Sequence, residues 1–144
     1  MRRIKKLAVF TLMIMLIAPT NIKVYAAAPE ETILAGMNAE RTKAGANTLV
    51  FDRALCAAAG TRAKEAAVLF SHTRPDGTDY YTVDPTSVYA ENLSYGTQEQ
   101  MGHVVEAFML SQSHKANVLD KGLTKVGVGV YQVGNTYYVA VEFG

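Results

Sequence analysis

The chain has 144 residues and a formal net charge of +1, and 49% of its residues are hydrophobic while 19% are charged. This balance is typical of a globular protein and excludes a disordered chain. The single cysteine, Cys56, excludes a fold held by internal disulfide bonds; we expect it to be a small buried side chain and not a nucleophile.

The first 26 residues have the pattern of a cleavable signal peptide. Four basic residues within the first six precede the apolar run 7–18, which is shorter than the about 20 residues that a membrane-spanning helix needs. Small residues then alternate before a cleavage site that we place after Ala26, with Ala28 as the second choice. An uncleaved membrane anchor is the alternative. We therefore expect residues 27–144 to be one secreted domain without a membrane span.

Removal of the signal peptide changes the charge. Residues 1–26 contain five of the fourteen Lys and Arg residues and none of the thirteen Asp and Glu residues, so residues 27–144 carry about −4. A domain of this charge has no basic surface to hold a phosphate backbone, and we expect no nucleic-acid partner.

Two helices are expected in the first half of this domain. Pro29 and the acids after it favour a helix start, and Gly45 is a natural stop. Asp52 can cap a second, alanine-rich helix that runs to about Leu69. The apolar residues 49–51 are interpreted as a connector between the two helices.

The middle of the chain is more irregular. Turn signals predict a loop over 71–87, and a short strand is expected within 88–94. Apolar residues at helical spacing predict a third helix, capped by Thr97 and ending near Ser111. A short turn over 115–119 should follow.

The end of the chain has the pattern of a β-hairpin around the turn 134–135. The expected register pairs Val133 with Thr136, Val130 with Val139, Val128 with Val141 and Val126 with Phe143. Gly127 and Gly129 then lie opposite Glu142 and Ala140 on a face without bulk, which either another backbone approaches closely or a cavity occupies. Helices followed by a hairpin predict an α+β fold with helices packed on a small, mostly antiparallel sheet.

Two histidines lie where side chains can point into a cleft. His72 and His114 each follow a predicted helix, whereas His103 lies on a helix side that we expect to be solvated. Glu91 lies between apolar neighbours, and a buried acid needs a partner such as histidine. Two imidazoles and a carboxylate could bind a divalent ion or form a structural hydrogen-bond network. Nucleophile, phosphate-loop and dinucleotide-loop motifs are absent from the sequence.

Five segments in the right order resemble the bacterial CAP (SCP-like) domain. The segment 37–45, MNAERTKAG, resembles its opening, and 70–77, FSHTRPDG, resembles the pattern FSHxRPDG. YAENLSYG at 89–96 resembles GENxxxG, FMLSQSHKANVL at 108–119 resembles WMxSPGHRxNIL, and VGVG at 126–129 resembles IGVG. The departures are Ala90 for Gly, Phe108 for Trp and Gln112-Ser113 for Pro-Gly.

The resemblance implies a three-layer α-β-α sandwich with a central cleft. By motif, the cleft residues are His72, Glu91, Ser111 and His114, where Ser111 stands at the position of a second acid in eukaryotic relatives. In some relatives the two histidines bind a divalent metal, often zinc, which points to His72 and His114 as metal ligands.

The resemblance also implies what the domain does. The first hypothesis is a secreted, non-catalytic binding or interaction module for a lipid, sterol or protein ligand. The alternative is a metal-assisted hydrolase or peptidase in which a metal ion polarises water and Glu91 is the base. The first is favoured because no nucleophile or complete base-orienting set is visible.

Overall fold

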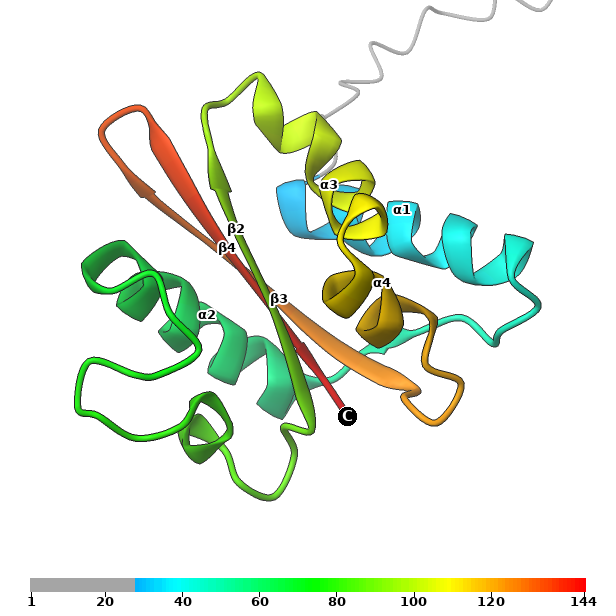
Figure 1. The fold of residues 1–144 in the computed structure, drawn as a ribbon, viewed down its shortest axis with the longest axis horizontal. Coiled ribbons are helices and arrows are strands. Elements are labelled where there is room, and N and C mark those ends of the chain that lie inside the picture. The colour runs from blue at the N-terminus through cyan, green and yellow to red at the C-terminus, as the bar shows by residue number, and fades with distance from the viewer. Residues whose placement is uncertain (1–27) are drawn as a thin grey trace, which may run out of the picture.

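A four-stranded sheet forms the middle layer of the computed structural model, which describes residues 28–144. The predicted signal peptide and the cleavage site after Ala26 lie outside the described residues. Helix α2 covers one face of the sheet, and α1, α3 and α4 cover the other, so the expected three-layer α+β sandwich is confirmed (Figure 1). The elements in chain order are α1 Pro29–Lys43, β1 Val50–Phe51, α2 Arg53–Val68, the 3₁₀ helix η1 Tyr80–Val83, β2 Ala90–Gly96, the 3₁₀ helix η2 Gln100–His103, α3 Val104–Leu110, α4 Gln112–Leu119, β3 Lys125–Val133 and β4 Thr136–Phe143.

The strands follow the order β1-β3-β4-β2. Strand β1 pairs with β3 in parallel, and the other two pairs are antiparallel, so the sheet is mostly antiparallel, as expected. The parallel pairing of Val50 with Lys125 is a correction, because the sequence suggested only a connector there. Strand β2 forms the opposite edge of the sheet. Among residues 28–144, no helix has the length and apolar character needed to cross a bilayer.

The first two helices begin where their caps predict. Pro29 occupies the first turn of α1, and Glu30 and Glu31 lie at its positive end. The Asp52 carboxylate caps α2 by accepting hydrogen bonds from the Ala54 and Leu55 amides at 2.9 and 3.2 Å.

The third predicted helix ends at Leu110, next to Ser111 as expected, but its first part, Gln100–His103, is a 3₁₀ helix. The backbone forms the 3₁₀ helix η2, then α3, and then turns at Ser111, where the φ and ψ angles of −96° and 122° are extended. Helix α4 follows directly, in the region where only a short turn was expected. The helical spacing of apolar residues continues from η2 into α3, because a 3₁₀ turn keeps nearly the same side of the helix facing the core. The sequence of α4 shows little apolar periodicity, because Val118 is the one fully buried residue of this helix.

The hairpin register is confirmed at every predicted pair. Its valine face, with Phe143, packs into the main core beneath α1, α3 and α4. On the other face, a Cβ at Gly127 would overlap the backbone of Leu55, and one at Gly129 would overlap the backbone of Ala59. The glycine face of the hairpin is therefore covered by the closely packed backbone of α2 and does not border a cavity. Cys56, expected to be buried, is only partly buried beside this contact.

Replacing Gly129 tests this close contact. We expect Gly129→Val to lower the free energy of unfolding by about 3 kcal/mol or more, because the α2 backbone cannot move aside as a side chain would. The matched control is Gly60→Ala on α2, where an added Cβ meets open space. We expect the control to be neutral or to stabilise by up to about 1 kcal/mol, because alanine is the better helix former. Urea unfolding followed by circular dichroism measures both; equal midpoints for the two variants would contradict the contact.

Candidate functional site

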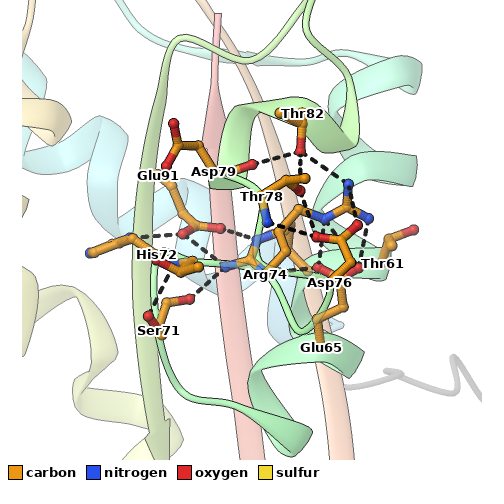
Figure 2. Close-up of polar contacts among 12 residues, drawn as sticks. Thr61, Glu65, Ser71, His72, Arg74, Asp76, Thr78, Asp79, Thr82 and Glu91 are labelled. Carbon is orange, nitrogen blue, oxygen red and sulfur yellow. Dashed lines mark hydrogen bonds and ion pairs between the residues drawn. The ribbon is translucent and has the colours of Figure 1, made fainter.

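The candidate residues lie on three different elements around the β2 edge of the sheet. Glu91 is on β2, His72 lies in the loop after α2, and His114 lies in α4 on the opposite helical layer. Ser111 separates α3 from α4. Figure 2 shows His72 and Ser71 beside Glu91, with Glu65 and Arg74 further along the same polar network.

A buried ion pair holds Glu91. The Arg62 Nε donates to Glu91 Oε2 at 2.6 Å, and the Arg62 Nη2 donates to Glu91 Oε1 at 3.2 Å. The side chains are 0% and 1% exposed, so both charges are removed from water. A two-point contact of this kind fixes the plane of the carboxylate as well as its position.

The remaining guanidinium bonds tie the following loop to α2. The Arg62 Nη2 also donates to the Ser71 carbonyl oxygen at 2.7 Å, and its Nη1 donates to Glu65 Oε2 at 2.7 Å. Glu65 accepts in turn from both the Nε and the Nη2 of Arg74. These bonds hold the residue directly before His72, so the loop reaches the cleft in a defined position.

His72 contacts Glu91 through its Nδ1 atom. The distance from Nδ1 to Glu91 Oε1 is 2.7 Å, while the imidazole side chain remains 56% exposed. Burial would raise the pKa of Glu91, but the hydrogen bonds from His72 and Arg62 outweigh burial and lower it. Because Glu91 is therefore ionised, it accepts, and Nδ1 carries the proton. The Nε2 atom of a neutral His72 then has a free lone pair.

His114 lies on α4, which packs against the strand β2 that carries Glu91. Burial, and then the electrostatic effect of the nearby His72, lower the pKa of His114, so its imidazole is neutral at neutral pH. The Asn92 side chain donates to the His114 carbonyl oxygen at 3.0 Å, which fastens α4 to the edge strand. Asn117 donates to the Asn92 side chain and to the Glu91 carbonyl oxygen.

The structure thus brings His72 against Glu91, and it fastens the helix that carries His114 to Asn92, the residue after Glu91. In the part of the chain that the structure describes, the recorded contact of the Ser111 hydroxyl is with Ser113 at 3.4 Å. His103 is exposed and pairs with Glu106, so its predicted solvated position is confirmed. Across residues 28–144, no group of three or more His, Cys, Asp or Glu side chains could hold a metal ion. A metal would rest on the two imidazoles.

Sequence reasoning missed two members of the network. Arg62 is fully buried and lies four residues before Ala66, on the stripe of α2 that was predicted to be apolar. Glu142 is also fully buried and is the cross-strand partner of Glu91. The sequence contained an indication of each residue. An arginine within an apolar helix stripe needs an acidic partner. The hairpin register placed Glu142 on the sheet face that α2 covers.

Glu142 is buried without a counter-ion. As an ionised acid it would have no hydrogen-bond partner for either oxygen among the described residues. Burial, and then the neighbouring Glu91 carboxylate, raise the pKa of Glu142 to about 10. Glu142 is therefore a neutral carboxylic acid at neutral pH, and in that form it can donate a hydrogen bond to Glu91.

The comparisons with known proteins agree with this architecture. The family described as the cysteine-rich secretory protein family, CAP, matches residues 34–143. The chain therefore belongs to the CAP family. It is 28% identical over 133 residues to the protein YkwD of Bacillus subtilis (strain 168), covering 83% of this chain. The chain spans about half, 48%, of the length of that curated relative.

Solved structures show the same fold. An outer surface protein from Borrelia burgdorferi has a TM-score of 0.66 at 22% identity, over 79% of this chain and 90% of that one. An extracellular protein containing an SCP domain from Bacillus anthracis str. Ames has a TM-score of 0.62 at 22% identity, over 79% of this chain and 40% of that one. Two proteins with this fold are thus described as an extracellular protein and an outer surface protein.

Removal of Arg62 tests the ion pair beneath the cleft. We expect Arg62→Met to destabilise the fold by about 3–5 kcal/mol at neutral pH, because Glu91 is left buried without its cation. The control is Lys43→Met, which breaks an exposed pair with Glu40 and should cost at most about 1 kcal/mol.

The same variant has a defined pH dependence. In the folded protein the pKa of Glu91 lies below the ordinary glutamate value of 4.5, so the pair stabilises the fold above that pH and stabilises it less as the pH falls through the lowered pKa. The difference between wild type and Arg62→Met in urea unfolding should therefore shrink in acid. A difference that does not change with pH would contradict the assignment of Glu91 as ionised.

Proposed function

We propose that this chain is a secreted, non-catalytic binding module of the CAP family, whose cleft holds a divalent metal ion, such as zinc, through His72 and His114. The observation that carries the proposal is the 2.7 Å contact between His72 Nδ1 and the buried Glu91 carboxylate. A carboxylate behind one imidazole nitrogen is the common arrangement for a histidine that ligates metal through the other.

The two imidazoles fit a metal in different ways. His72 is held by Glu91 and offers Nε2 on its exposed side. His114 is partly buried, and its lowered pKa keeps the ring neutral, as a ligand nitrogen must be. Zinc accepts imidazole nitrogen readily, and two protein ligands leave positions open for water or for an oxygen atom of a ligand. Such a site is weak and should fill only when zinc is plentiful.

A known structure supports this choice of metal. The structure titled NaASP2 with Zn²⁺ has a TM-score of 0.61 at 15% identity, over 79% of this chain and 77% of that one. That similarity concerns the fold, so the choice of His72 and His114 as ligands rests on the contacts of these residues.

A binding role is favoured over hydrolysis by the state of Glu91. Both of its oxygens accept hydrogen bonds, from Arg62 and from His72, and its pKa is lowered. A general base works best with a pKa near the operating pH and with a free lone pair directed at the substrate. Glu91 has neither property, and it is better suited to hold His72 than to take a proton.

Two independent observations support a location outside the cell. Residues 1–26 have the pattern of a signal peptide, and relatives of the same fold are described as extracellular and outer surface proteins. A lipid, sterol or protein ligand, as the family resemblance implies, would then be met outside the cell. The cleft metal would provide an anchor for an oxygen atom of that ligand.

Zinc titration by calorimetry tests the metal. We expect His72→Ala and His114→Ala each to weaken zinc binding by about tenfold or more, since each removes one of two protein ligands. Binding by the wild type should also weaken below about pH 6, because a protonated imidazole cannot ligate. The control is His103→Ala, which removes an exposed histidine outside the cleft and should bind like the wild type. Equal affinity in all four proteins would remove the metal site.

The mature N-terminus tests secretion. We expect the protein collected from the culture medium of a secreting host to begin at Ala27, because the small residues before it suit signal peptidase. N-terminal sequencing reads this directly. Recovery of the protein in the membrane fraction with Met1 retained would instead support the uncleaved anchor.

A further inference from the structure

Two acids lie side by side beneath α2. Glu91 and Glu142 are cross-strand partners on β2 and β4, and they are 4% and 0% exposed. On the other side of Glu142 lies Gly127 of β3, which has no side chain and touches the α2 backbone. Glu142 is therefore enclosed between a carboxylate, a glycine and a helix, in a place where water cannot solvate a charge.

One cation, Arg62, lies near both acids but is recorded in contact with Glu91 alone of the two. The recorded hydrogen bonds of Arg62 go to Glu91, to Glu65 and to the Ser71 carbonyl oxygen. Neither oxygen of Glu142 has a partner among the described residues if it is counted as an ionised acid. Two adjacent buried carboxyl groups with a single counter-ion cannot both lose their protons, and the one without the cation keeps its proton.

We propose that Glu142 is a protonated acid that donates a hydrogen bond to Glu91 and so positions the Glu91–His72 pair. The pair is then held from two sides, by Arg62 on α2 and by Glu142 on β4. The effect of Glu142 on a metal in the cleft rests on the proposed function, whereas its protonation does not.

The groups facing Glu142 agree with a neutral acid. From α2 they are Arg62 and Glu65, and from β2 Glu91. From η1 the group is Tyr80, whose pKa is raised, first of all by burial. Set against one guanidinium, these acidic groups favour retention of the Glu142 proton.

Two variants with side chains of similar size distinguish the protonation of Glu142 from its hydrogen bond to Glu91. Glu142→Gln removes the titrating proton but keeps an N–H donor for Glu91, while Glu142→Met removes the donor as well. Side-chain carboxyl signals are followed by NMR from about pH 5 to about pH 9, a range in which an unperturbed glutamate is ionised. The imidazole nitrogen signals of His72 are recorded in the same proteins, and zinc affinity is measured by calorimetry at neutral pH. Circular dichroism confirms that each variant is folded.

The expected results are specific. One carboxyl signal of the wild type stays in the protonated position over the whole range and is missing from both variants. His72 carries its proton on Nδ1 in the wild type and in Glu142→Gln, and becomes a mixture of tautomers in Glu142→Met. Zinc affinity stays within about twofold in Glu142→Gln and falls by about three- to tenfold in Glu142→Met, less than for a group that touches a ligand directly.

Two results would overturn the proposal. The first is a Glu142 carboxyl group that is ionised at about pH 5, as an unperturbed glutamate is. The second is the same His72 tautomer in Glu142→Met as in the wild type. If the wild type binds no zinc, the metal of the proposed function is removed, and the carboxyl and imidazole signals still decide the role of Glu142.

Discussion

The fold and the cleft both depend on the buried pair of Arg62 and Glu91. The pair joins α2 to the edge strand β2, and its spare donors hold the loop that carries His72. Burying two charges is costly, and the cost is recovered only when the geometry is good and the remaining donors are satisfied. Both conditions are met here, so the pair places a rigid carboxylate behind an exposed imidazole.

The pair can form only because α2 lies unusually close to the sheet. Gly127 and Gly129 leave the strand without bulk, and the α2 backbone occupies that space. Alanines of α2 and Ala140 of β4 continue the close packing toward the edge strand. The helix axis is thereby lowered until a side chain as long as Arg62 reaches Glu91 while remaining fully buried. The glycines of β3 thus allow the close helix–sheet packing in which Arg62 and Glu91 form their ion pair.

Charge is distributed unevenly among the buried acids. Glu91 has a cation and is ionised, whereas Glu142 has none and is neutral. An ionised Glu91 must accept from His72, and this fixes which imidazole nitrogen faces the cleft. The tautomer of the exposed His72 is therefore determined by buried residues that no ligand can reach. Substitutions of these buried residues should change the protonation of the His72 nitrogens.

The sequence by itself determined the local features. The caps at Pro29 and Asp52 and the hairpin register follow from short-range rules, because each depends on neighbours along the chain or on strict alternation. Only the tertiary structure decided the helix α4 after Ser111, the partner of Glu91 and the protonation of Glu142. The reason is physical: burial and the distance between charges depend on how α2 and β4 pack, and residues 62, 91 and 142 are far apart in the sequence.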